Sequence, residues 1–341
     1  MYRLTVAFLI LCCSTQLWAQ SFRAYSGEFL QLGAGARSLG LGGAGIAFSD
    51  DATSGYWNPA NLITLEYPSV SGMHESRFDG TVKYDYGAVA IPVGANGGAA
   101  LSVFHIGIDN IKDTRNAFVD VTGSGTFDGD NYLDYTKVKT FGNYDWGFYF
   151  SYGQKRDSLL SYGVNLKVIV RKLDPQNSAT GFGFDAGVRY TPLSNLTLAA
   201  VGQDITTTLL AYTSGTKELV SPTLKIGGAY RWNIFEAEEH TIMPVIDLDL
   251  RFENRGSVSE VALGPISADV HFGAEYEFDK VIALRAGFTD TKKLTLGAGV
   301  HLPKLSIDYA FQSFSAQEEL GNIHRLSFSI SLVRDPWKRP Q

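Results

Sequence analysis

Apolar and polar residues alternate in long runs through most of this chain, and this alternation limits its fold more than any other feature. Between Tyr144 and Tyr152, every second residue is aromatic. Runs of the same kind cover residues 162–170, 182–190 and 326–332. Because successive side chains of a strand point to opposite faces, each run predicts a strand in a sheet with one apolar face. No stretch after the N-terminus has about 18 consecutive apolar residues, which excludes a bundle of membrane-spanning helices.

The alternation predicts about fourteen strands, most of them ten residues or longer. Strands of soluble proteins average about 5–6 residues, whereas a tilted crossing of a membrane takes about 9–11 residues. The strand lengths therefore favour a membrane β-barrel over a soluble β-sandwich or propeller, which is the alternative. The predicted strands lie near residues 68–78, 81–92, 97–108, 143–154, 159–172, 181–191, 195–203, 222–232, 240–252, 267–278, 281–289, 292–302, 304–314 and 323–333.

The lengths of the connections support the same fold. The long connections, 109–142, 204–221 and 253–266, all follow odd-numbered strands, whereas connections such as 191–194 are short. Outer-membrane barrels have long outer loops and short periplasmic turns. A sheet in hydrocarbon must also close, because every backbone polar group there needs a partner. We therefore predict an all-β, transmembrane antiparallel β-barrel over residues 67–333, in the bacterial outer membrane, with both chain ends on the periplasmic side.

The first twenty residues are typical of a secretory signal peptide. Arg3 precedes an apolar stretch from Leu4 to Cys13 that is too short to span a bilayer, and Ala19 supplies a small residue at the expected cleavage site. A lipoprotein is an alternative, but the lipid-modified cysteine would then follow Leu11, which is not small. Both cysteines of the chain lie in this segment, so the mature protein is expected to contain none.

Charge and motifs argue against several other functions. The formal net charge is −6 and no basic block occurs, which argues against a nucleic-acid partner. The six histidines are scattered, and no serine lies in a G-x-S-x-G motif, so we predict no enzyme, no metal and no cofactor. A hydrolase with a Ser/His pair at the rim of the barrel is an alternative, because the sequence does not show which serine and histidine meet across strands. Calcium binding at 128–131 and Asp134 is a further alternative, but this loop lacks the spacing of a calcium loop.

Residues 21–66 do not alternate and are rich in glycine. Residues 40–45 match G-x-G-x-x-G, but no strand–turn–helix unit surrounds them, which argues against a dinucleotide site. Glycine instead allows close packing of one backbone against another. Asp50 and Asp51 are expected to cap a helix that ends at Asn58 and Pro59. We predict a plug inside the barrel lumen, with a free periplasmic extension as the alternative.

Polar residues recur on the face of the strands that we expect to point into the lumen. They predict a solvated lumen, and some of them could line a ligand path or anchor the plug. These residues are Lys83, Asp85, Asn165, Lys167, Asp185, Arg189, Asp247, Asp249, Arg285 and Asp308.

The glycine-rich segment resembles the N-terminal signature of the PorV/PorQ family, which in turn resembles the fatty-acid transporter FadL. The resemblance is concentrated in residues 29–62, and residues 222–230 resemble a later strand of the family. It implies a fourteen-stranded outer-membrane barrel with a plugged lumen. The plug and lumen residues that it implies are Arg37, Gly40, Gly42, Gly43, Gly45, Asp50, Asp51, Trp57, Asn58, Pro59 and Ala60. The tail 334–341 departs from the aromatic C-terminus of many such barrels.

Two functions follow from the resemblance. As a PorV/PorQ-type protein, the chain would assist type IX secretion by receiving the C-terminal sorting domains of secreted proteins and passing them to the attachment components. Its partner surface would include Phe118, Phe127, Tyr132 and Tyr135 in the loop 109–142. As a FadL-like protein, it would instead be a channel for long-chain fatty acids or other hydrophobic small molecules. A structural barrel with neither task is a third possibility.

Overall fold

The computed structural model describes residues 27–234, 239–252, 259–264, 266–290, 292–313 and 321–340. The predicted signal peptide and the first six residues of the predicted plug lie outside these ranges, as do residues 253–258, 265 and 314–320 of two connections.

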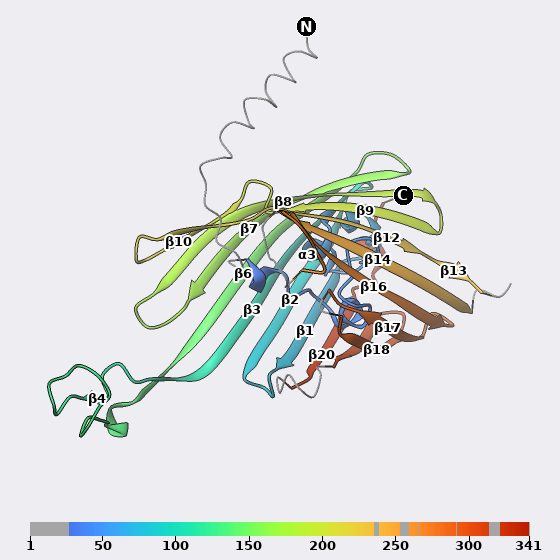
Figure 1. The fold of residues 1–341 in the computed structure, drawn as a ribbon. Helices are drawn as coiled ribbons and strands as arrows, with labels where there is room; N and C mark the ends of the chain where they lie inside the picture. The colour runs from blue at the N-terminus through green and yellow to red at the C-terminus, as the bar shows by residue number, and fades with distance from the viewer. Residues whose placement is uncertain are drawn as a thin grey trace, which may run out of the picture.

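Fourteen antiparallel strands form a closed barrel, as the alternation predicted (Figure 1). Each strand pairs with the next along the chain, and closure is achieved because β1 pairs with β2 on one side and with β20 on the other. The barrel strands are β1 (Ser69–Arg77), β2 (Val82–Val93), β3 (Gly97–Asp113), β6 (Lys139–Lys155), β7 (Leu160–Lys172), β8 (Ser178–Leu193), β9 (Leu196–Gln203), β12 (Thr223–Tyr230), β14 (His240–Arg251), β16 (Ile266–Phe278), β17 (Ile282–Phe288), β18 (Leu294–His301), β19 (Leu305–Gln312) and β20 (Ile323–Ser331).

Shorter strands extend the barrel or lie in its loops. The hairpin of β10 (Thr208–Tyr212) and β11 (Lys217–Val220) continues the wall by pairing with β8. β13 (Trp232–Asn233) pairs with β14, and β15 (Val261–Leu263) pairs with β16.

The loop between β3 and β6 carries a separate two-stranded sheet of β4 (Phe118–Val119) and β5 (Tyr132–Leu133), followed by the 3₁₀-helix η4 (Tyr135–Lys137). This loop projects away from the barrel (Figure 1).

The long connections share one end of the barrel, which we call the outer end. They are 114–138, 204–222 and 252–265, close to the predicted ranges, and 313–322, where the predicted connection was 315–322 and was not counted among the long ones. The opposite, periplasmic end carries short turns such as 94–96 and 194–195, and both the plug exit and the C-terminal tail lie there. This asymmetry is the one expected of an outer-membrane barrel.

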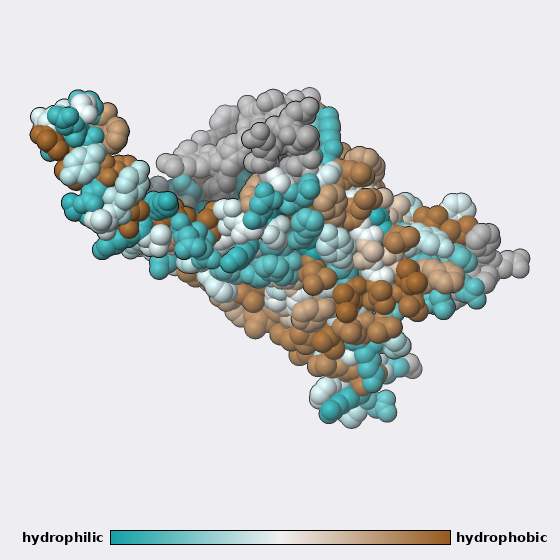
Figure 2. Space-filling view, turned by 90° about the horizontal axis from the view of Figure 1, so that it is seen from below, coloured by the Kyte–Doolittle hydropathy of each residue, from teal (hydrophilic) through white to brown (hydrophobic). Residues whose placement is uncertain are grey.

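The outer surface of the barrel is apolar. Side chains such as Val164, Phe182 and Leu284 are exposed on it, and Figure 2 shows hydrophobic residues gathered around the middle of the barrel. Most of the predicted lumen residues are buried inside, including Lys167, Asp185 and Asp249. No helix within the described ranges is long and apolar enough to cross a membrane.

The predicted orientation of β2 was wrong. Lys83 is exposed on the outer surface with Asp85, while Tyr84 and Tyr86 are buried in the lumen. The two tyrosines pack against plug and wall aromatics, and the polar side chains find partners outside: His74 Nδ1 lies 2.6 Å from Asp85 Oδ1. Residues of both faces are partly apolar in this strand, so alternation alone does not identify the lumen side.

The plug consists of four short helical segments before β1. They are η2 (Glu28–Leu30), α2 (Ala36–Gly40), α3 (Ser54–Trp57) and η3 (Pro59–Thr64). α3 ends before Asn58 and Pro59 as predicted, but the predicted cap was wrong: the helix begins at Ser54, and Thr53 provides no side-chain cap. Asp51 instead accepts hydrogen bonds from the Thr53 amide and hydroxyl, at 2.8 and 2.5 Å.

The C-terminal tail folds back across the periplasmic end. Its 3₁₀-helix η6 (Asp335–Trp337) precedes Arg339, whose guanidinium donates to backbone carbonyls of the plug exit and of the β2–β3 turn. The shortest of these bonds reach Gly97 O at 2.6 Å and Leu65 O at 2.8 Å. The tail therefore ties the plug exit to the barrel wall.

Arg339→Ala should loosen this tie. Hydrogen bonds from a charged group contribute about 1.5–3 kcal/mol when buried, and this guanidinium is only partly buried, so we expect a loss of about 1–2 kcal/mol in the free energy of unfolding. Urea unfolding of the barrel in detergent measures it. Asp335→Ala, which removes an exposed side chain of the same tail, is the control. Equal stability of the two variants would contradict the prediction.

Candidate functional site

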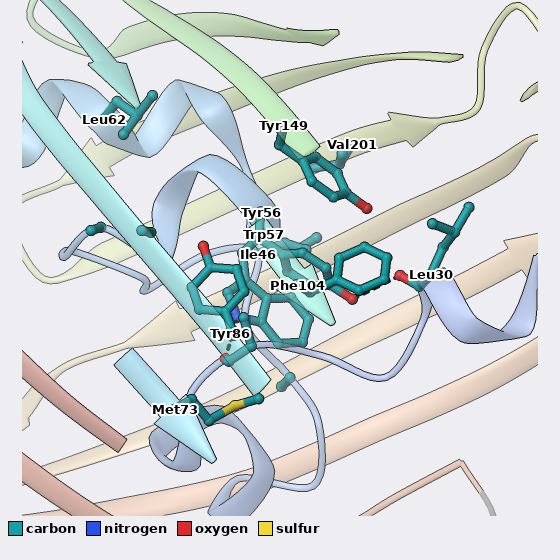
Figure 3. Close-up of a cluster of buried hydrophobic side chains, with 14 of the residues drawn as sticks. Leu30, Ile46, Tyr56, Trp57, Leu62, Met73, Tyr86, Phe104, Tyr149 and Val201 are labelled. Atoms are coloured by element: carbon teal, nitrogen blue, oxygen red, sulfur yellow. Dashed lines mark hydrogen bonds between the residues drawn. The ribbon is translucent and has the colours of Figure 1, made fainter. Parts of the chain in front are cut away.

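The lumen is filled by an aromatic cluster to which plug and wall both contribute. The Tyr56 ring of the plug packs edge-on against Trp57, with ring centroids 5.3 Å apart, and against Tyr149 of β6 at 5.6 Å. Tyr86 of β2 and Phe104 of β3 complete the cluster (Figure 3). Because large aromatic rings bury much apolar area, this cluster fixes the plug against the β2–β9 side of the barrel.

Glycines of the plug lie against glycines of the wall on the opposite side. A Cβ on Gly42 would lie 2.2 Å from the carbonyl oxygen of Phe288, and a Cβ on Gly287 would lie 2.4 Å from the Gly42 amide nitrogen. Gly40 and Gly297 approach each other in the same way. No side chain fits between the two backbones here, so the plug reaches β16, β17 and β18 through main-chain contact.

The end of the plug lies against glycines of β6, β7 and β8. A Cβ on Gly163 would lie 2.5 Å from the Pro59 carbonyl carbon, and one on Gly187 would lie 2.2 Å from Asn58 Oδ1. The Asn58 amide group donates to Val188 O at 3.1 Å, and Ser161 Oγ donates to Ala60 O at 3.1 Å. The Asn-Pro-Ala tripeptide therefore serves as a fixed contact with the wall.

Buried carboxylates of the wall accept hydrogen bonds from the plug backbone and from Arg37. Asp247 Oδ2 accepts from the amides of Gly45 and Ile46, at 2.7 and 3.1 Å. Glu275 accepts from Arg37 of the plug at 2.7 Å and from Arg285 of β17 at 2.6 Å. These bonds satisfy groups that would otherwise be buried without partners.

Arg325 of β20 binds two backbone carbonyls of the plug. Its Nε donates to Glu75 of β1, while its two terminal nitrogens donate to Gly35 O at 3.2 Å and Leu32 O at 2.8 Å. Arg77 donates to the other oxygen of Glu75. One wall arginine thus binds two carbonyls of the plug and is itself neutralised by a buried carboxylate.

Cavities lie on both sides of this part of the plug. The outer cavity, of about 390 Å³, is lined by Leu32, Gly33 and Leu39 of the plug and by the outer ends of β1, β14 and β19. Two periplasmic cavities, of about 230 and 290 Å³, share the plug residues Phe48, Ser49 and Asp50 and the periplasmic ends of the strands as lining. The first is also lined by Ala34, Gly35, Arg37 and Ser38. We call residues 33–39 the partition, because this plug segment lines the outer cavity with Gly33 and Leu39 and a periplasmic cavity with the residues between them.

The structure places all the predicted plug residues inside the barrel, but in different settings. Gly40, Gly42, Gly43 and Gly45 face wall backbone or aromatic rings, and Trp57 donates from its indole nitrogen to Ala34 O at 2.8 Å. Asp50 is half-exposed at a periplasmic cavity, whereas Asp51 is largely buried.

Sequence reasoning missed Glu75, Glu275 and Arg325. Each lies at an inward position of a strand, and that alternation is the signal that could have suggested them. In the described part of the chain, no group of three or more His, Cys, Asp or Glu side chains could hold a metal ion.

Asp51 gives the plug a dependence on pH. Burial raises the pKa of this carboxyl above its ordinary value, although hydrogen bonds from Thr53 oppose the shift. A carboxyl whose pKa is higher in the folded state than in the unfolded state loses stabilisation as pH rises. We expect Asp51→Asn to match the wild type near pH 4 and to unfold at a higher temperature near pH 7. Thermal unfolding of both proteins at pH 4 and pH 7 tests this. The same difference in unfolding temperature between variant and wild type at the two pH values would contradict it.

The predicted partner residues lie together in the projecting loop. Phe118 and Phe127 have ring centroids 6.4 Å apart, and the exposed fractions of Phe127 and Tyr135 are 72% and 76%. Tyr132 is also exposed. None of these side chains contacts the plug cluster described above, so the loop and the lumen are separate candidate sites.

Comparison with known proteins identifies the fold. No protein-family model matches the sequence, and no curated protein matches it. The toluene transporter TodX of P. putida is 12% identical with a TM-score of 0.59, over 89% of this chain and 100% of that one. The toluene transporter TbuX of Ralstonia pickettii is 14% identical with a TM-score of 0.56, over 89% and 99%. A FadL homologue of Pseudomonas aeruginosa is 12% identical with a TM-score of 0.51, over 88% and 98%.

At these identities the likeness concerns the fold. The chain is a multi-pass outer-membrane β-barrel of the fourteen-stranded kind seen in FadL-type proteins, and its apolar outer surface matches that setting. The solved structures it resembles are those of transporters and channels.

Proposed function

We propose that this barrel is a channel for small hydrophobic molecules, gated by its own plug. The observation that carries the proposal is the partition: residues 33–39 separate an outer cavity from a periplasmic cavity. Displacing this short segment would join the two into a path through the lumen. The fold shared with the toluene transporters TodX and TbuX supports the proposal, because toluene is a small hydrophobic molecule.

The partition is held in a manner that suits reversible movement. Two arginines bind it, Arg325 through the plug carbonyls and Arg37 through Glu275, and its backbone amides make single hydrogen bonds, from Ala36 to Ser327 Oγ at 2.9 Å and from Gly33 to Tyr56 Oη at 3.0 Å. A neutral hydrogen bond contributes only about 0.5–1.5 kcal/mol net. Gly33 and Gly35 both have positive φ, at 79° and 83°, so the segment can change conformation where other residues could not.

Uptake by whole cells tests the proposal. The chain is expressed in a Gram-negative host that lacks its own fatty-acid channel, and entry of labelled toluene and of oleate is measured. We expect uptake of at least one of them well above the empty-vector level. A correctly assembled barrel that admits neither would overturn the proposal.

A reversible cross-link supplies the matched control. Ala36 and Ser327 are adjacent, so Ala36→Cys with Ser327→Cys would form a disulfide between partition and wall. Uptake should fall in the oxidised variant and return after reduction. Unchanged uptake in the oxidised form would show that the path does not cross the partition.

The projecting loop favours a second candidate function. As the PorV/PorQ resemblance implies, the chain would receive sorting domains of type IX cargo, and the exposed aromatics Phe127, Tyr132 and Tyr135 would provide the contact. Deleting residues 114–138 in a host with that secretion system should leave cargo unattached while the barrel still assembles. Normal attachment would remove this candidate, whatever the outcome of the uptake test.

A further inference from the structure

Arg189 differs from the other cationic side chains that face the lumen. It is half-buried on the inward face of β8, and it forms no ion pair with a carboxylate in the described part of the chain. Its guanidinium makes one hydrogen bond there, from Nη2 to Thr197 Oγ1 at 3.2 Å. Within the described strands, the other buried or half-buried lysines and arginines are each paired with a carboxylate: Arg77, Lys167, Arg171, Lys225, Arg251, Arg285 and Arg325.

This arginine lines the second periplasmic cavity, the one of about 290 Å³, which lies between the plug and the wall. The plug contributes residues 47–50 to the lining, and the wall contributes the periplasmic ends of β8, β9 and β12 together with Arg231. Polar residues complete the wall side: Ser194, Asn195 and Thr197. Because Arg189 is only half-buried and has five N–H donors, most of its donors remain for a molecule inside the cavity.

The charges of the cavity lining leave Arg189 without a counter-ion. Arg231 Nη1 lies 3.8 Å from Glu277 Oε1, so this second guanidinium has a partner. Asp50 also lines the cavity, but its Oδ1 accepts a hydrogen bond from Arg37 at 3.1 Å. Two guanidiniums and one carboxylate therefore line the cavity. The excess positive charge lies in a partly desolvated site, where the attraction of an opposite charge is stronger than in bulk water.

We propose that this cavity binds a small hydrophilic oxyanion, a carboxylate or a phosphate ester, with Arg189 as its main anchor. The planar fork of a guanidinium matches two oxygens of either group and donates two parallel hydrogen bonds to them. The side chains of Ser194 and Asn195 make no hydrogen bond within the described ranges, so they can donate further bonds to the same ligand. The inference goes beyond the proposed channel and does not depend on it.

Other classes of ligand fit this cavity less well. A hydrocarbon would leave the donors of Arg189 without acceptors, at the cost of desolvating a charge. A cation would meet two guanidiniums, and a neutral polyol would accept hydrogen bonds but leave the positive charge uncompensated. The volume of about 290 Å³ is close to the lower end of small-molecule pockets, about 300–1,000 Å³, which suits a compact anion.

Saturation-transfer NMR on the intact barrel, in an uncharged detergent at low salt, tests the inference. The probes are lactate, glycerol 3-phosphate and glycerol, which represent a carboxylate, a phosphate ester and a neutral molecule of similar size. We expect at least one of the two anions to bind and glycerol to bind more weakly or not at all. The stronger anion then identifies the ligand class. Failure of both anions to bind, or equal binding of glycerol, would overturn the inference.

Variants of one side chain assign the site. Arg189→Gln should weaken binding of the anion by roughly tenfold, the equivalent of one charge-assisted hydrogen bond. Arg189→Lys keeps the charge but not the fork, so its loss should be smaller. Arg156→Gln is the matched control, because it removes the same charge from an exposed arginine in the periplasmic turn between β6 and β7.

Heat-modifiable gel mobility confirms that each variant is folded. Unchanged affinity in Arg189→Gln, or an equal loss in Arg156→Gln, would also overturn the inference, because the anion would then bind elsewhere or respond only to net charge. A barrel that binds neither anion yet admits toluene would leave the proposed channel standing.

Discussion

Gly42→Ala is expected to displace the plug from the wall while leaving the barrel itself folded. The added Cβ would lie 2.2 Å from Phe288 O and 2.6 Å from Phe272 O, which are backbone atoms of β17 and β16 and cannot rotate away. Gly42 also has a φ of 76°, a conformation that costs a residue with a side chain about 1–2 kcal/mol. Together with overpacking, which costs about 1–3 kcal/mol, we expect a loss of roughly 2–5 kcal/mol in the stability of the plugged state.

Ion conductance across a planar bilayer measures this directly. Wild-type channels should be mostly closed, and the Gly42→Ala channel should conduct more, because the plug no longer fits against β16 and β17. Gly94→Ala is the matched control: its φ is 58°, but nothing lies within 4 Å of the position of its Cβ. It carries the conformational cost without the collision, so its conductance should stay near the wild-type level. A closed Gly42→Ala channel would show that the wall yields instead of the plug.

The strands could be predicted from sequence because the evidence for them is local. β6, β7 and β8 repeat their alternation over 17, 13 and 16 residues, so they are recognisable without knowledge of their neighbours. The same holds for the end of α3, since Pro59 acts on the residue that precedes it. Assignment of the long loops to one end then follows from strand order alone.

The contacts that hold the plug could not be predicted in this way. Arg325 and Glu75 are 250 residues apart, and Arg37 and Glu275 are 238 apart. Their pairing depends on barrel closure and on the register of strands that are not consecutive, which no local pattern encodes. The error at Lys83 has a related cause, because the inward face of β2 is decided by the aromatic cluster it meets in the lumen rather than by polarity.

Arg325→Ala is expected to release the partition. The side chain is 1% exposed, and its removal deletes the bonds to Gly35 O and Leu32 O and leaves a buried carboxylate, Glu75, with Arg77 as its remaining partner. Removing one partner of a buried ion pair lowers the free energy of unfolding by about 3–5 kcal/mol. We expect a loss near ~3 kcal/mol here, because Arg77 still pairs with Glu75. The outer and periplasmic cavities should then join, which a conductance recording and faster toluene uptake would both detect.

Arg77→Ala separates the effect on the partition from the effect on the ion pair. Arg77 shares Glu75 with Arg325 but makes no hydrogen bond to the plug within the described residues, so its loss weakens the same ion cluster without freeing the partition. We expect this variant to be less stable but still closed. If Arg77→Ala conducted as well as Arg325→Ala, the charge of the cluster and not the two plug carbonyls would keep the lumen shut. That result would shift the gate from the partition to the β1–β20 seam, where the first and last strands of the barrel meet.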